Sequence, residues 1–189
     1  MWYIRKQQLK HLFIDIKRIR PPAQLKYSLD FQIDEDDWKE IYLRPKQLLY
    51  DHKIQETQFK ILHNYVPTNR LLFKMKKIPS DKYNFCDMYL QNLYHLLYDC
   101  LVVRNFWYSV ERFLEAICGQ NINLTKSDVI FGRKDSDEIL NKIILYAKQY
   151  IINCKTNDLH LESNIFINYF NNMIDLENAM LFKLPYVPP

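Results

Sequence analysis

The residues with the clearest capacity for chemistry lie in the stretch NFCDMYLQNLYHLLYDC, residues 84–100. Two thiols and an imidazole, those of Cys86, His95 and Cys100, are ligand types that zinc prefers. A structural zinc site uses four such ligands, and two of them often come from one C-x2-C turn. Tyr89 stands where the second cysteine of that turn would be, and a phenol with a pKa of about 10 is a poor zinc ligand. The stretch therefore has the composition of a zinc site that lacks one conventional ligand.

The spacing of His95 and Cys100 sets a condition on the backbone. Their separation corresponds to roughly 140° around a regular α-helix, so the two side chains would point in different directions. They can bind one ion only if the helix bends or ends between them. Asp87, Asp99 or a water molecule could then complete the coordination. The alternative is that both cysteines are small buried apolar residues and that His95 is an ordinary hydrogen-bonded side chain.

Other groupings of reactive residues indicate structure rather than catalysis. The acidic run at 34–37 could suggest a two-metal site, but Trp38 opens an amphipathic pattern directly after it, which favours a helix N-terminus. Cys118 and Cys154 end or continue apolar helical patterns and are predicted to be core residues. The sequence has no serine elbow or P-loop motif, and nothing marks an orienting partner for a cysteine–histidine pair. We therefore predict that the chain is not an enzyme.

Basic residues are concentrated at the start of the chain and again around residue 74, and the formal net charge is +4. Lysine and arginine neutralise phosphates and tyrosines stack on unpaired bases, so RNA or DNA is the expected partner. A solvated helix face is the alternative for each cluster. The candidate nucleic-acid-binding residues are Arg5, Lys6, Lys10, Lys17, Arg18, Arg20, Arg70, Lys74, Lys76 and Lys77.

The composition also indicates where the protein works. No apolar run approaches the roughly 18 residues of a membrane span, and the start MWYIRKQQLKHLFIDI lacks the apolar core of a signal peptide. Four unevenly spaced cysteines fit a reducing compartment better than a disulfide framework. We expect an intracellular protein, nuclear or cytoplasmic, with no membrane partner and no small-molecule substrate.

The elements that must position these residues are predicted to be helices. Only two glycines occur, and apolar residues recur at three- and four-residue spacing. Val103, Phe106, Trp107, Val110 and Leu114 make the clearest such pattern and are expected at the centre of the core. The expected helices cover residues 1–20, a segment opened by Trp38, 52–65, 69–76 with Thr68 as N-cap, 103–118, 138–154 and 163–184, with a loop around Cys86. The predicted fold class is an all-α, irregular multi-helix domain with a short zinc-knuckle-like loop and a C-terminal helical lobe.

Three blocks of sequence together resemble the reverse-transcriptase zinc-binding domain, which follows the polymerase in non-LTR (LINE-type) retrotransposon polyproteins. The first, ETQFKILHNYVPTNRLLFKMKKIPSD at 56–81, is similar to the family's pattern FQ-x-x-hLH-x-x-hPT-x-x-x-L. The second, from residue 84 to Trp107, is similar to C-x-x-C … ET-x-x-HLF-x-x-C-x-x-x-x-x-FW. The third is LTKSDVIFG at 124–132, followed by LNKIILYAKQYI. Because LFIDIKRIRPPAQLKY and DWKEIYLRP also fit the lead-in, the resemblance covers most of the chain.

The resemblance implies that Cys86, His95 and Cys100 are the family's metal ligands and that the site is degenerate at Tyr89. The Glu-Thr pair that usually precedes the histidine corresponds to Gln91-Asn92, which is a second departure from the pattern. The implied cofactor is zinc, held weakly or lost.

The resemblance also implies a domain organisation and a function. It divides the chain into an N-terminal basic helix and linker (1–30), a zinc-binding-like helical domain (31–118) and a C-terminal helical lobe (119–189). The sequence lacks the separated catalytic aspartates of a polymerase, so the chain resembles a detached, retrotransposon-derived module. Such a module would assist an adjacent reverse transcriptase by holding template RNA or target DNA. The alternatives are a helical domain that docks on the polymerase without binding nucleic acid, or a remnant with no present function.

Overall fold

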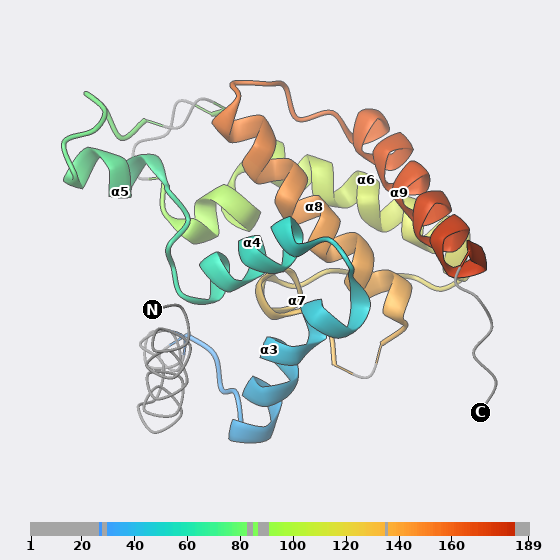
Figure 1. The fold of residues 1–189 in the computed structure, drawn as a ribbon. Helices are drawn as coiled ribbons and strands as arrows, with labels where there is room; N and C mark the ends of the chain where they lie inside the picture. The colour runs from blue at the N-terminus through green and yellow to red at the C-terminus, as the bar shows by residue number, and fades with distance from the viewer. Residues whose placement is uncertain (1–26, 28–29, 83–84, 87–90, 135, 184–189) are drawn as a thin grey trace, which may run out of the picture.

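The computed structural model describes residues 27, 30–82, 85–86, 91–134 and 136–183. Within these ranges all regular secondary structure is helical, which confirms the predicted all-α class (Figure 1). The predicted helix at 1–20 lies outside the described residues. The helices are α3 (Glu35–Leu48), α4 (His52–Leu62), α5 (Asn69–Lys74), the π-helix η1 (His95–Asp99), α6 (Leu101–Cys118), α7 (Lys126–Phe131), α8 (Glu138–Thr156) and α9 (Ser163–Lys183).

Polar side chains begin several helices where the sequence predicts it. The hydroxyl of Thr68 accepts a hydrogen bond from the backbone N–H of Leu71, so Thr68 is the N-cap of α5. Glu35, Asp36 and Asp37 occupy the first turn of α3, where carboxylates complement the helix dipole. The acidic run therefore begins a helix, as its position before Trp38 indicates.

The hydrophobic pattern predicts no helix at α7, which has only six residues. Its start is a capping box, in which Thr125 and Asp128 each accept a hydrogen bond from the other's backbone N–H. Its end is Gly132, whose φ of 84° favours glycine. A helix this short has too few residues to show a periodic pattern, so its only sequence signal is the T-x-x-D spacing of the cap.

Helix α8 lies at the centre of the molecule and crosses the middle of the bundle in Figure 1. It packs against α3, α4, η1 and α9. One buried cluster extends from Tyr27 to Phe170, so segments on both sides of residue 118 share a core. The tie to α9 is partly polar, because the hydroxyl of Tyr146 donates to Glu177 (2.8 Å), which also pairs with Lys142 (2.9 Å).

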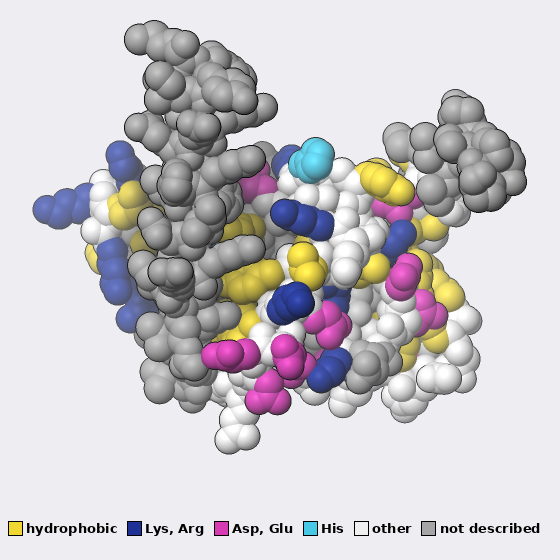
Figure 2. Space-filling model, turned by 60° about the horizontal axis from the view of Figure 1, so that its bottom comes forward, with side chains coloured by type: hydrophobic (Ala, Val, Ile, Leu, Met, Phe, Trp, Pro, Cys, Tyr) yellow, Lys and Arg dark blue, Asp and Glu magenta, His cyan; other side chains and the backbone are white. Residues whose placement is uncertain are grey.

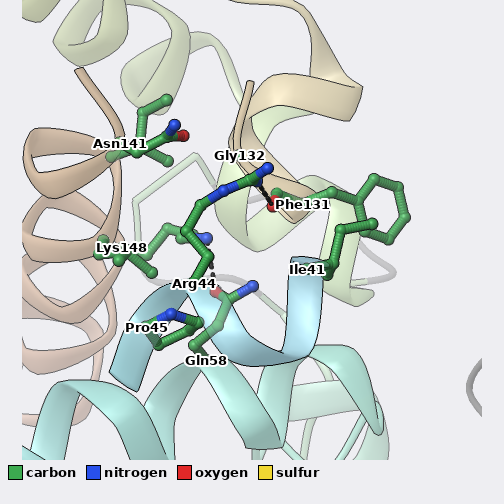
Figure 3. A pocket seen from close by; sticks show the side chains of 10 residues that line it. Ile41, Arg44, Pro45, Gln58, Phe131, Gly132, Asn141 and Lys148 are labelled. Carbon is green, nitrogen blue, oxygen red and sulfur yellow. Dashed lines mark hydrogen bonds between the residues drawn. The ribbon is translucent and has the colours of Figure 1, made fainter. Parts of the chain in front are cut away.

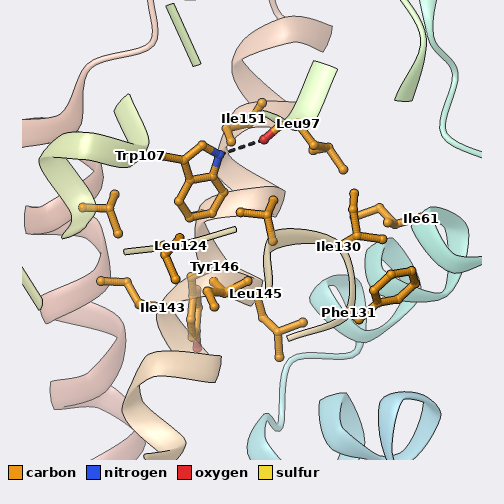
Figure 4. Packing of buried hydrophobic residues seen from close by; sticks show 14 of the residues in the cluster. Ile61, Leu97, Trp107, Leu124, Ile130, Phe131, Ile143, Leu145, Tyr146 and Ile151 are labelled. Atoms are coloured by element: carbon orange, nitrogen blue, oxygen red, sulfur yellow. Dashed lines mark hydrogen bonds between the residues drawn. The ribbon is translucent and has the colours of Figure 1, made fainter. Parts of the chain in front are cut away.

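Helix α6 carries the predicted centre of the core. Val103, Phe106, Trp107, Val110 and Leu114 are all buried, which confirms the prediction. The indole N–H of Trp107 donates to the carbonyl of Leu97 at 2.7 Å, so this ring also ties α6 to η1 (Figure 4).

The apolar residues at helical spacing in the sequence also include Phe59 and Ile117, and these two are not buried. Phe59 and Ile117 are about half exposed, at 51% and 53%. Phe59 packs its ring on His63 instead, with the ring centroids 4.2 Å apart, and Ile117 lies in the last turn of α6. Of the two cysteines predicted to be core residues, Cys154 is buried, whereas Cys118 is only partly buried.

Two buried basic side chains face a small cavity lined by α3, α4, α7 and α8 (Figure 3). The guanidinium of Arg44 donates to the carbonyl of Phe131 at 2.8 Å. The side-chain nitrogen of Lys148 donates to the side-chain oxygen of Gln58 at 2.5 Å and to the carbonyl of Ile130 at 3.3 Å. The cavity measures about 10 Å³, which is the space of a single water molecule. It is therefore a packing feature and too small to be a ligand site.

We expect Lys148 to make stability depend on pH. Burial lowers the pKa of Lys148 well below its ordinary value, and the charge of Arg44 lowers it further. Between that lowered pKa and about 10.5, the unfolded chain binds more protons than the fold, so stability rises with pH. Lys148→Met should remove this contribution. The free energy of unfolding of the variant, relative to the parent, should therefore decline as the pH rises towards about 10.5.

Urea unfolding of both proteins between about pH 6 and 9.5 measures this difference. The variant also loses the hydrogen bond to Gln58, which shifts the difference in free energy of unfolding by a constant amount. The slope of this difference against pH is therefore the quantity that tests the prediction. A difference that stays constant over this range contradicts the prediction.

Candidate metal centre

A π-helix brings His95 and Cys100 to the same side of the chain. The backbone N–H of Cys100 donates to the carbonyl of His95 at 3.3 Å and closes η1. Residues five apart are bonded in a π-helix and stand one above the other, whereas an α-helix would separate them by roughly 140°. Cys100 itself has extended backbone (φ −65°, ψ 133°), so η1 ends there before α6 begins. The backbone between His95 and Cys100 therefore both changes its helical geometry and reaches a helix end, which are the two conditions that let their side chains approach each other.

Cys86 completes a cluster of metal-ligating atoms. Its Sγ lies 3.1 Å from Nε2 of His95, and the ligand atoms of Cys86, His95 and Cys100 all lie within 4.8 Å of one another. Zn–S bonds of about 2.3 Å and Zn–N bonds of about 2.0 Å place neighbouring ligand atoms of a tetrahedron about 3.5–3.8 Å apart. The cluster is therefore close enough to hold a metal ion, and two sulfurs with one imidazole suit zinc.

The surroundings of the cluster affect both kinds of ligand. Burial raises the pKa of the Cys100 thiol above its ordinary value, while the backbone N–H groups of Val103 and Val102 act in the opposite direction. Burial also lowers the pKa of His95, against a smaller opposing effect of Asp99. A lowered histidine pKa favours the neutral imidazole, which is the form that binds metal.

Hydrogen bonds join the loop that bears Cys86 to α5. The backbone N–H of Asn69, the first residue of α5, donates to the side-chain oxygen of Gln91 at 2.5 Å. The side-chain amide of Asn69 also donates to the carbonyl of Lys82. Further along, the side chain of Asn92 accepts from the backbone N–H of His95 at 2.8 Å and begins the turn that carries this ligand. One residue of α5 thus holds both ends of the loop that contains Cys86.

The fourth coordination position has several candidates in the sequence. Tyr89 and Asp87 lie outside the described residues. Asp99 is engaged elsewhere, because its carboxylate pairs with the ammonium of Lys126 at 2.7 Å. Among the described residues, the cluster therefore offers three ligands.

The second group of predicted basic residues is accessible. Arg70, Lys74, Lys76 and Lys77 are all exposed. Lys and Arg side chains gather at the edge of the molecule formed by α5, at the left of Figure 2. We call residues 69–77, which include α5, the basic segment. The first group, Arg5, Lys6, Lys10, Lys17, Arg18 and Arg20, lies outside the described residues, and its role stays a prediction.

Sequence reasoning missed the residues that support the centre. Gln91 and Asn92 differ from the pattern of the domain that the sequence resembles, yet these are the side chains that bind α5 and the turn at His95. Nothing in their types predicts these partners, because both hydrogen bonds depend on how the chain folds back. The N-cap signal of Thr68 was the nearest available indication, since it places Asn69 at the start of α5.

Comparison with protein-family models, with curated proteins and with solved structures finds no match for this chain. Within the part of the chain that the structure describes, no helix has both the length and the apolar character that crossing a membrane requires.

Proposed function

We propose that the chain is a non-catalytic module that binds RNA or DNA through the basic segment, and that zinc at Cys86, His95 and Cys100 holds this segment in place. The observation that carries the proposal is the junction between the two features. Asn69 begins the basic segment and hydrogen-bonds Lys82 and Gln91, on either side of Cys86. Bound zinc would act as a structural crosslink between this loop and η1, with three protein ligands giving weaker binding than four.

The chemistry of the basic segment fits a nucleic-acid backbone. Exposed lysines and arginines neutralise phosphates, and the resulting release of counterions drives binding. Tyr65, just before the segment, is 62% exposed and stacks on His63 with a centroid distance of 5.8 Å. Exposed aromatic rings and cationic side chains are the two features that surfaces binding single strands combine.

The resemblance to the reverse-transcriptase zinc-binding domain supports a retrotransposon origin and the reverse transcriptase of the parent element as a protein partner. The basic segment also exposes Phe73 (45%) and Met75 (55%). If the domain docks on the polymerase without nucleic acid, such apolar side chains would be part of that interface. Binding measurements with nucleic acid alone separate these two functions.

We expect binding to labelled DNA or RNA to weaken steeply with salt and to depend on the basic segment. For duplex DNA, the slope of log K against log salt falls by about 0.9 for each phosphate contact. Replacing Lys74, Lys76 and Lys77 together by glutamine should flatten the slope by up to this amount per lysine. Fluorescence anisotropy at several salt concentrations measures the slope.

The matched control replaces Lys39, Lys46 and Lys53, which are also exposed but belong to α3 and α4. This control removes the same charge and should change the slope much less. Equal flattening by both variants would show a diffuse effect of net charge. Binding that is absent at low salt, or independent of salt, would favour protein docking instead.

A further inference from the structure

A second, larger cavity opens beside the basic segment. It measures about 310 Å³ and lies between the end of α4, the helix α5 and the residues that lead into η1. This volume is at the lower end of the range of small-ligand sites, about 300–1,000 Å³, and far above the cavity at Lys148. The cavity thus has room for one flat ring with its substituents and is too small for a double helix.

The lining of this cavity is chemically mixed. Arg70 and Lys74 contribute cationic groups from one side of α5, because residues four apart share a helix face. Asn64 and Asn92 contribute side-chain amides, which can both donate and accept hydrogen bonds. The apolar part includes Leu71. Cationic, amide and apolar groups together match the phosphate, the polar edge and the flat face of a nucleotide.

Building on the nucleic-acid binding proposed above, we propose that this cavity receives one unpaired nucleotide of a single strand. Arg70 and Lys74 lie against its phosphate, and Asn64 and Asn92 lie at the edge of its base. A nucleotide within a strand is favoured over a free nucleotide because the cationic side chains continue past the cavity. Lys76 and Lys77 are exposed beyond α5 and do not line it, so they provide contacts for the neighbouring phosphates.

The cavity and the metal centre share a residue. Asn92 lines the cavity, and its side-chain oxygen accepts the hydrogen bond from the backbone N–H of His95. A change in the turn that carries His95 therefore also moves one wall of the cavity. The proposed nucleotide site is thus supported by the same segment that carries the candidate ligand His95.

The test compares an oligothymidylate with an analogue in which an abasic spacer replaces every thymidine. Both have the same phosphates, so only base contacts distinguish them. We expect the parent protein to bind the oligothymidylate about fivefold or more tightly than the abasic strand, as base recognition at a single-strand site predicts. Leu71→Trp fills the cavity without changing charge and should abolish this preference.

Charge variants provide a second, independent measurement. Arg70→Gln with Lys74→Gln removes the cations inside the cavity, whereas Lys76→Gln with Lys77→Gln removes the same charge outside it. The inner pair should lose more affinity for the oligothymidylate and should lose the base preference. The outer pair should weaken both strands equally and keep the preference. Circular dichroism checks that each variant is folded.

The outcomes separate this inference from the proposed function. If the parent binds both strands equally with a strong salt dependence, the basic segment binds phosphates and the cavity takes no base. If the inner and outer pairs have identical effects, the cavity site is likewise wrong. If neither strand binds at low salt, this inference fails, and the proposed function fails as well if labelled RNA and duplex DNA also do not bind.

Discussion

Trp107→Ala is expected to lower the free energy of unfolding by about 3–5 kcal/mol, the range for large aromatic truncations in protein cores. Trp107 is 1% exposed at the centre of α6, so the truncation leaves a cavity that its neighbours cannot fill. The change also removes the indole N–H that donates to the carbonyl of Leu97 in η1. A buried carbonyl that loses its partner adds to the cost.

The adjacent residue provides the control for this measurement. Tyr108 lies on the same helix and is 61% exposed, so Tyr108→Ala should change stability by about 0.5 kcal/mol or less. Urea unfolding of the two variants and the parent measures the difference. A loss well under about 1 kcal/mol for Trp107→Ala would show that α6 is peripheral to the core.

The helices that the sequence predicts correctly are those whose burial follows a regular period. In α6 the residues from Val103 to Leu114 recur at helical spacing and face one core, so the pattern alone identifies both the helix and its buried side. The hydrophobic period does not reveal an element as short as α7. It also predicts the wrong burial for Phe59, which is hydrophobic but about half exposed. It also fails at Lys148, because a lysine is ordinarily a surface residue and only the folded chain supplies its buried acceptors.

The candidate site was predictable in its ligand types but not in its geometry. Thiol and imidazole groups identify Cys86, His95 and Cys100 directly from the sequence. Their convergence depends on the π-helical turn, which has no periodic signature in five residues. The hydrogen bonds that join Asn69 to Lys82 and Gln91 could not be predicted from the sequence either, because these residues come together only in the folded chain.

We expect Tyr89→Cys to produce tight zinc binding and a stability that depends on the metal. The change restores a thiol at C-x2-C spacing from Cys86, which gives the cluster the four ligands of a structural zinc site. The three candidate ligands of the parent, Cys86, His95 and Cys100, already lie close together. The added thiolate would therefore be the fourth ligand of a site whose other three groups are largely in place. Saturation at about a hundred times Kd stabilises a fold by about 2.7 kcal/mol, and a chelator should reverse this gain.

The parent protein should fold without metal and should give up zinc to a chelator, because three ligands supply only part of the binding free energy that four would supply. Cys100 is only one of many buried residues of the core, most of which lie on α6, α8 and the other helices, so chelation should not unfold the protein. Tyr89→Ser is the matched control, since it removes the phenol without adding a ligand and should leave zinc binding weak. Cys86→Ser in the Tyr89→Cys background should abolish the gain, because C-x2-C ligation needs both thiols.

Zinc that remains at one equivalent in the parent after chelation would contradict the three-ligand interpretation and would place Tyr89, Asp87 or a water molecule at the fourth position. A Tyr89→Cys protein that binds no more tightly than the parent would show instead that position 89 does not reach the cluster.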